Sequence, residues 1–183
     1  MQIYRCLICG DTIVMESKPD NCPYCGSDES YIVYTIDYPE DINDITTTTQ
    51  EYDDLMHAAQ LEDTNGKFYE NLGEVDEDST LSDLYHRLSK IENEHLEVFA
   101  KLMKQPVDSL DFDRGEVDPK ETWDDNIDIS TAQEIEARDF YNLAADRSTT
   151  PRVIQVFKAI AEVEQNHIDV DVIARRIADT KAL

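Results

Sequence analysis

The sequence predicts a mainly α-helical protein, a four-helix bundle preceded by a small module that binds a metal ion through cysteines. Three observations predict this fold. Two parts of the chain repeat each other at an offset of 72 residues, apolar residues recur at helical spacing within each repeat, and all four cysteines lie in two pairs near the N-terminus. The expected organisation is a cysteine module at 1–38, a linker at 39–50 and the bundle at 51–183.

The repeat brings the same three polar residues into each half of the bundle. In both halves a lone glutamate precedes a Glu-x-x-His sequence by 30 residues, and turn-forming residues lie midway between them. Each half is therefore predicted to be a hairpin of two antiparallel helices, with its glutamate and its Glu-x-x-His at the same height. The repeated residues are Glu62, Glu92 and His95 in the first half, and Glu134, Glu164 and His167 in the second.

Helical periodicity places these polar residues on apolar faces. The apolar stripe of the second predicted helix is interrupted only by Glu92 and His95, and that of the fourth only by Glu164 and His167. Buried carboxylates and imidazoles destabilise a core unless they are paired or bound to metal. Four carboxylates and two imidazoles that converge in one bundle therefore predict a site for two cations.

These patterns also have ordinary explanations. A single Glu-x-x-His is usually part of a solvated helix face, but two copies in register with two lone glutamates favour a metal site. His57 and His86 lie off the ligand faces, so they are expected to be solvated or internally hydrogen-bonded. Tyr69 and Tyr141 would serve equally well as packing aromatics. Asp171 lies one turn after His167 on the ligand row, where it could orient an imidazole, but the acidic surface is the favoured place for it.

The cysteines form two C-x2-C pairs separated by twelve residues, and a glycine follows each pair. A tight thiolate turn needs such a permissive backbone. Four thiolates at this spacing predict a tetrahedral site for one zinc or iron ion, without choosing between the two metals. Disulfides are disfavoured because no signal peptide precedes the motif, which also predicts a cytoplasmic protein. The predicted ligands are Cys6, Cys9, Cys22 and Cys25.

Two connections frame the bundle. Thr48 with Glu51 predicts a capping box at the start of the first helix, and Ser130 with Gln133 predicts a similar start for the third. The segment 105–129 is the predicted crossover between the two hairpins, since bundles of this kind need one long connection.

The net charge limits the partners of the protein. A formal charge of -25, with 41 acidic and 16 basic residues, is spread along the chain and disfavours nucleic acids and anionic membranes. No apolar run approaches the length of a membrane span. Adaptation to high salt is the favoured explanation of the acidity, and a docking surface for a basic electron donor is the alternative.

The two parts of the chain resemble two parts of one family. Tyr4–Gly10 with Cys22–Gly26 resembles a rubredoxin-like domain, and the remainder resembles the ferritin-like di-iron domain of rubrerythrin, in the reverse of the commoner order. The resemblance implies a one-electron iron centre feeding a di-iron site that reduces hydrogen peroxide to water. It implies a head-to-tail homodimer that brings the two centres together. It also makes the six repeated residues iron ligands and Tyr69 and Tyr141 inward-facing neighbours of the iron.

One position departs from the family pattern. Rubrerythrins typically carry a further glutamate three residues after the ligand of the third helix, and here Ala137 follows Glu134 at that distance. This departure favours ferroxidase or oxidase chemistry relative to a peroxidase. Three functions therefore stay open: a peroxide reductase, a ferroxidase or iron-handling protein, and a non-enzymatic protein with structural zinc at the cysteines. The oxidant, peroxide or oxygen, and the electron donor are open as well.

Overall fold

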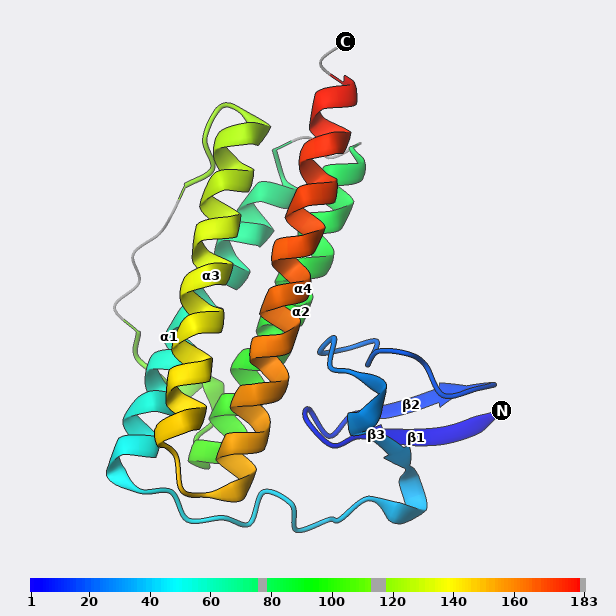
Figure 1. The fold of residues 1–183 in the computed structure, drawn as a ribbon, viewed down its shortest axis with the longest axis vertical. Helices are drawn as coiled ribbons and strands as arrows, with labels where there is room; N and C mark the ends of the chain where they lie inside the picture. The colour runs from blue at the N-terminus through cyan, green and yellow to red at the C-terminus, as the bar shows by residue number, and fades with distance from the viewer. Residues whose placement is uncertain (76–78, 113–117, 182–183) are drawn as a thin grey trace.

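The computed structural model describes residues 1–75, 79–112 and 118–181. Four long helices lie side by side, and a small sheet packs against the flank of the bundle next to α2 and α4 (Figure 1). A mainly helical protein with a small cysteine-bearing sheet at its N-terminus is the fold class that the sequence predicts, and the structure confirms it. Among the helices of the described segments, none combines the length and apolar character that a membrane span requires.

The bundle consists of two antiparallel hairpins. Helices α1 (Thr49–Gly73) and α2 (Thr80–Met103) form the first, and α3 (Trp123–Arg147) and α4 (Pro151–Lys181) form the second. Within the bundle α1 packs chiefly on α2 and α3 chiefly on α4. The two halves that repeat in sequence are therefore the two hairpins, as predicted.

The helix starts follow the predicted signals only in part. Thr48 and Glu51 form the expected capping box of α1. The expected start at Ser130 is wrong, because α3 begins at Trp123 with Thr122 as its N-cap, and Ser130 is buried in the middle of the helix. The third helix thus occupies the last part of the predicted crossover. Its true cap was available in the sequence, since the Thr122 side chain accepts a hydrogen bond from the backbone N–H of Asp125.

Glu51 also joins the start of α1 to the start of α4. Its carboxylate accepts hydrogen bonds from the backbone N–H groups of Thr48, Thr149 and Thr150 at 2.7–2.8 Å. Burial raises the pKa of Glu51, but these hydrogen bonds outweigh burial and lower the pKa to about 2. The ionised carboxylate of Glu51 therefore links the two hairpins through hydrogen bonds at one end of the bundle.

The apolar stripes of the predicted helices form the core. In α4 the residues Val153, Val156 and Phe157 are fully buried. In α2 the stripe is buried except at Leu84 and Ile91, which are half-buried. These two residues line a cavity beside the cysteine module, so the stripe faces partly into that cavity.

The cysteine module is built on three short antiparallel strands in the order β2-β1-β3. They are β1 (Gln2–Cys6), β2 (Thr12–Met15) and β3 (Ile32–Tyr34). Each cysteine pair forms a turn closed by a glycine with positive φ, +89° at Gly10 and +74° at Gly26. The backbone N–H of each glycine donates to the carbonyl of the first cysteine of its pair. These turns bring the four thiols together at one end of the sheet.

Candidate metal centres

The six repeated polar residues converge in the interior of the bundle and define what we call the carboxylate site. All six are at most 4% exposed. They fall into two groups whose ligand atoms lie within 4.8 Å of one another, and Glu92 and Glu164 belong to both groups. Each group would hold one metal ion, and Glu92 and Glu164 would be available to both ions. One group is Glu62, Glu92, His95 and Glu164, and the other is Glu92, Glu134, Glu164 and His167.

Each imidazole of the carboxylate site is surrounded by three carboxylates. The Nδ1 atoms lie 3.0–3.5 Å from the nearest oxygen of each carboxylate. The two rings are nearly parallel, with centroids 6.3 Å apart. The oxygens thus gather around each Nδ1 from three different helices. They belong to Glu62, Glu92 and Glu164 around His95, and to Glu92, Glu134 and Glu164 around His167.

The carboxylate oxygens and imidazole nitrogens of this site are better suited to binding metal ions than to hydrogen-bonding one another. Both oxygens of Glu92 and Glu164, one oxygen each of Glu62 and Glu134, and the Nδ1 atoms of both histidines are buried and have no hydrogen-bond partner within the described part of the chain. Buried polar groups in proteins are nearly always paired, so such a concentration indicates a ligand. A mixed set of carboxylates and imidazoles suits iron, manganese or zinc. The ligand assignment itself remains a prediction.

Without metal, the carboxylate site holds protons tightly. Burial raises the pKa of Glu62 and Glu134 well above the usual value, and repulsion from neighbouring carboxylates adds to this. Burial lowers the pKa values of His95 and His167, but attraction to the surrounding glutamates outweighs it and raises them well above the usual value. Metal ions must displace these protons, so loading the site releases protons to solvent.

The two repeated tyrosines connect the hairpins through the carboxylate site. Tyr141 on α3 donates a hydrogen bond of 2.6 Å to Glu62 on α1, and Tyr69 on α1 donates one to Glu134 on α3. Both rings are fully buried. Each tyrosine therefore orients the lone glutamate of the opposite hairpin. This role explains why the tyrosine recurs in the repeat, and it is more than the packing of an aromatic ring.

The favoured placement of Asp171 on the acidic surface is wrong. The side chain is only 2% exposed, so it does not belong to the acidic surface. Its carboxylate accepts hydrogen bonds from Tyr85 at 3.1 Å and from Thr131 at 2.9 Å. The available signal was its position one turn after His167 on the inward row of α4. His57 and His86 lie outside the site as expected, the first against Phe140 and the second near Glu74.

The four cysteines form a second candidate metal centre, which we call the cysteine site. All four are buried, no disulfide joins them, and their sulfurs lie within 4.8 Å of one another. The Cys6 sulfur also accepts a hydrogen bond of 3.3 Å from the backbone N–H of Ile8, and Ser27 Oγ lies 3.2 Å from it. Such contacts stabilise thiolate charge, as an all-thiolate metal site requires.

The cysteine module docks onto α2 and α4 through the backbone of its turns. Three basic side chains of the bundle donate hydrogen bonds to carbonyl oxygens of the module. Gly26 lies so close to α4 that a Cβ atom there would be 2.9 Å from Val163 Cγ1. The donor and acceptor pairs are Arg87 with Pro23, Lys101 with Cys9, and Arg152 with Ile8.

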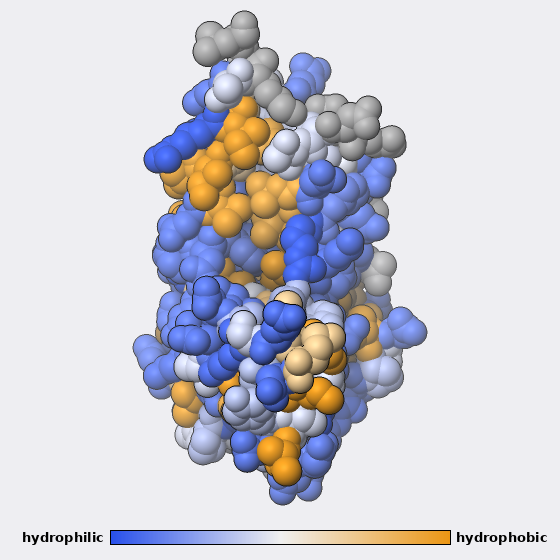
Figure 2. Space-filling view, turned by 90° about the vertical axis from the view of Figure 1, so that its right-hand side faces the viewer, coloured by the Kyte–Doolittle hydropathy of each residue, from blue (hydrophilic) through white to orange (hydrophobic). Residues whose placement is uncertain are grey.

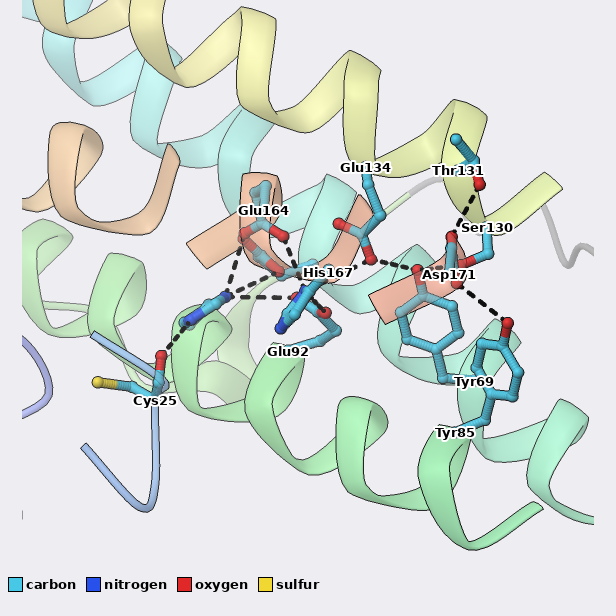
Figure 3. Close-up of polar contacts among 12 residues, drawn as sticks. Cys25, Tyr69, Tyr85, Glu92, Ser130, Thr131, Glu134, Glu164, His167 and Asp171 are labelled. Carbon is cyan, nitrogen blue, oxygen red and sulfur yellow. Dashed lines mark hydrogen bonds and ion pairs between the residues drawn. The ribbon is translucent and has the colours of Figure 1, made fainter. Parts of the chain in front are cut away.

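This docking joins the two candidate metal centres within one chain. The Nε2 atom of His95 lies 2.9 Å from the carbonyl oxygen of Cys25, and both residues are fully buried. Figure 3 labels Cys25 and shows its carbonyl beside the residues of the carboxylate site. Sequence patterns gave no sign of this contact. The head-to-tail dimer implied by the resemblance is not needed to bring the centres together, and a homodimer stays a prediction.

A cavity of about 820 Å³ lies where the module meets the bundle. Its wall includes Cys22 and Gly26 on one side and His167 on the other, so it reaches both candidate metal centres. The Nε2 atom of His167 has no hydrogen-bond partner among the described residues. Figure 2 views this side of the molecule and shows apolar side chains on the bundle above the module. The apolar part of the cavity wall consists of Leu84, Leu88, Ile91, Val163 and Val170.

Comparison with known proteins agrees with the geometry. The family model of rubrerythrin matches residues 53–170, which include all six residues of the carboxylate site. No curated protein matches the chain, and no solved structure does. The match covers more than half of the chain, and the four clustered cysteines before it fit the rubredoxin-like module that the resemblance implied. The chain belongs to the rubrerythrin family.

Proposed function

We propose that this protein reduces hydrogen peroxide to water, with electrons that enter at the cysteine site and are used at the carboxylate site. The contact between the Cys25 carbonyl and His95 carries the proposal. Iron at both sites would supply the redox chemistry that side chains lack. The overall reaction, H2O2 + 2 e⁻ + 2 H⁺ → 2 H2O, breaks the O–O bond and consumes two electrons and two protons.

The two sites suit different parts of this reaction. Four thiolates complete the coordination of a tetrahedral ion, so the cysteine site offers peroxide no place to bind and suits electron transfer alone. The carboxylate site lies next to the cavity that reaches His167, which gives a small oxidant a route inwards.

His95 is the residue that links the two sites. Its Nε2–H donates to the Cys25 carbonyl, which fixes the orientation of the ring and leaves Nδ1 for a metal ion. A single imidazole therefore separates the backbone of the cysteine site from the carboxylate site. A storage protein would have no use for this connection.

A second candidate function is ferroxidase or iron-handling activity. The observation in its favour is Ala137, which is fully buried on α3 where the family usually carries a glutamate. Glu136 is exposed and does not replace that carboxylate.

A third candidate is a non-enzymatic protein with structural zinc at the cysteine site. Metal analysis distinguishes it, because structural zinc predicts about one zinc and two irons per chain, whereas electron transfer predicts about three irons and no zinc.

The proposed function is tested by mixing the anaerobically reduced protein with peroxide or with oxygen in a stopped-flow spectrometer. We expect peroxide to oxidise the carboxylate site faster than oxygen does, and the cysteine site to be oxidised afterwards as its electrons move inwards. Faster reaction with oxygen, together with oxidation of added ferrous iron, would favour the ferroxidase instead.

Gly26→Ala should weaken the connection between the centres while leaving both metal sites loaded. The added Cβ would lie 2.9 Å from Val163 Cγ1, so the turn must move away from α4 and take the Cys25 carbonyl away from His95. We expect slower oxidation of the cysteine site after peroxide is added to the reduced protein, with unchanged metal content.

Gly10→Ala is the matched control. Gly10 also has a positive φ, but its added Cβ would meet Tyr38 Oη at 3.2 Å, inside the cysteine module. Both variants should lose about 1–2 kcal/mol of stability because alanine is strained in this conformation. Equal rates of electron transfer in the two variants would contradict a route through Cys25 and His95.

A further inference from the structure

Four basic side chains surround the two cysteine turns, 6–10 and 22–26, although the chain has only 16 basic residues against 41 acidic ones. Each of the four donates a hydrogen bond to a backbone carbonyl of these turns. Three belong to helices of the bundle and one to β1, so both parts of the chain contribute cations. The donor and acceptor pairs are Arg5 with Gly10, Arg87 with Pro23, Lys101 with Cys9, and Arg152 with Ile8.

Arg152 differs from the other three cations in its surroundings. It is 6% exposed, and among the arginines that the structure describes it is the only one that is buried. Arg5 and Lys101 form ion pairs with carboxylates at nitrogen-to-oxygen distances of 2.9 Å and 3.4 Å, and Arg87 is exposed. Their charges are therefore compensated by a carboxylate or screened by solvent, whereas the charge of Arg152 is shielded from water.

The side chains that hold Arg152 are neutral amides. Its Nε donates to Asn43 Oδ1 at 3.0 Å, its Nη1 to Gln155 Oε1 at 2.9 Å, and its Nη2 to the Ile8 carbonyl at 3.1 Å. Glu51, the buried carboxylate at this end of α4, accepts from backbone N–H groups instead. No carboxylate in the described part of the chain forms an ion pair with Arg152. Since an arginine stays protonated in proteins, a buried cation is left without a carboxylate counter-charge.

The cysteine site can supply the missing counter-charge. Burial lowers the pKa of Arg152, and Tyr38, Cys6 and Cys9 oppose this. The guanidinium meets the first cysteine turn at Ile8, whose own N–H donates to the Cys6 sulfur at 3.3 Å. Four thiolates carry more charge than the one divalent or trivalent ion that they would hold, so the loaded site is negative. A buried cation and a buried anion thus lie on either side of one turn of backbone.

We propose that the positive charge of Arg152 raises the reduction potential of iron at the cysteine site and so favours the entry of electrons there. Reduction from the ferric to the ferrous form takes one electron from the external donor and adds one negative charge to the site. A fixed cation shielded from water stabilises the more negative form more strongly. Arg152 contacts neither the thiolates nor peroxide, so it is a positioning residue that acts through its field. The inference rests on the proposed function in placing iron at this site.

Arg152→Gln is the first test, because it removes the charge and keeps a side chain that can still donate to the Ile8 carbonyl. The potential is measured by spectroelectrochemical titration of the full-length, iron-loaded protein. We expect the equilibrium constant for reduction of the cysteine site to fall about tenfold, which for a one-electron couple is a shift of about 59 mV. Arg152→Lys retains the charge and should retain most of the wild-type potential.

Arg87→Gln is the matched control. Arg87 donates to a carbonyl of the other cysteine turn in the same way, but it is exposed, so solvent screens its charge. Its loss should leave the potential close to that of the wild-type protein. An unchanged potential in Arg152→Gln, or equal shifts in the two variants, would overturn the role of Arg152.

Asn43→Asp changes the charge while Arg152 stays in place. The new carboxylate has nearly the shape of the amide and lies beside Arg152 Nε, so it compensates the guanidinium and keeps the hydrogen bond. We expect the potential to fall here too, even if Arg152→Gln proves unable to fold. Asn71→Asp is its control, because Asn71 is exposed near the opposite end of α1 from Glu51. An unchanged potential in Asn43→Asp would show that the charge of Arg152 does not act on the site.

A second measurement needs no redox chemistry. Zinc and gallium ions both suit four thiolates, but the divalent zinc leaves the site with one more negative charge than the trivalent gallium does. If Arg152 stabilises negative charge, Arg152→Gln should lower the unfolding temperature of the zinc form more than that of the gallium form, each compared with wild-type protein holding the same metal. Equal losses would mean that Arg152 only supports the fold, and would overturn the proposal.

These measurements separate the role of Arg152 from the proposed function. If the purified protein holds zinc at the cysteine site or does not reduce peroxide, the same site reconstituted with iron still reports the potential. A lower potential in Arg152→Gln and Asn43→Asp would then leave the role of Arg152 standing while the proposed function fails. Peroxide reduction with the same potential in the wild-type protein and in both variants would have the opposite meaning.

Discussion

Glu92→Ala is expected to abolish the binding of both metal ions at the carboxylate site. Glu92 belongs to both ligand groups, and its two oxygens face the two different imidazoles, at 3.3 Å from His95 Nδ1 and 3.0 Å from His167 Nδ1. Removing it takes one ligand from each ion at once. Metal analysis of the purified protein should therefore find the carboxylate site empty of both ions, while the cysteine site keeps its own.

The bundle itself should survive this change. Glu62 and Glu134 can stay protonated in the core, since burial already raises their pKa values well above the usual value. Circular dichroism should show an unchanged helix content. Glu97→Ala is the matched control, because Glu97 is an exposed glutamate of the same helix that forms an ion pair with Lys101 at 3.4 Å. A Glu92→Ala protein that retains two ions would contradict the ligand assignment.

The sequence could reveal the carboxylate site because the information there is local and periodic. A glutamate and a histidine three residues apart share one helix face, and the repeat supplies the same pair on a second hairpin. The cysteine site was accessible for the same reason, since its ligands lie in two short turns. Such patterns need no knowledge of how the elements pack.

The connection between the sites could not be read in the same way. It depends on a backbone carbonyl at Cys25 meeting a side chain on α2, a contact between residues 70 positions apart. Backbone groups have the same chemistry at every residue, so no pattern marks this one. The closest trace in the sequence is Gly26, whose missing side chain lets the turn approach Val163.

Ser130 and Asp171 were missed because each matched a more common pattern. A serine followed by glutamine three residues later usually begins a helix, but Thr122 caps α3 earlier, so tertiary packing and not capping determines the place of Ser130. An aspartate in a strongly acidic chain usually lies at the surface. The inward row of α4, on which Asp171 follows His167, was the stronger signal.

Removing the electron-transfer capacity of the cysteine site should stop peroxide reduction with a reductant that cannot reach the carboxylate site. In Cys9→Ser with Cys22→Ser, two of the four thiolates are lost, and neither is the residue whose carbonyl contacts His95. Steady-state turnover with a protein reductant should collapse to the level of the apoprotein. The carboxylate site should still bind its metal, because none of its six residues is changed.

The loss of a metal from so small a module also threatens its fold, so a second experiment separates folding from electron transfer. Zinc at the cysteine site preserves the tetrahedral thiolate geometry but has no redox chemistry. Protein with zinc at the cysteine site and iron at the carboxylate site should therefore keep the contact between Cys25 and His95 and still fail in coupled turnover. When its carboxylate site is reduced beforehand, a single reaction with peroxide should proceed at the normal rate. Unchanged steady-state turnover of the zinc form would show that the module is structural, and the ferroxidase or iron-handling function would then lead.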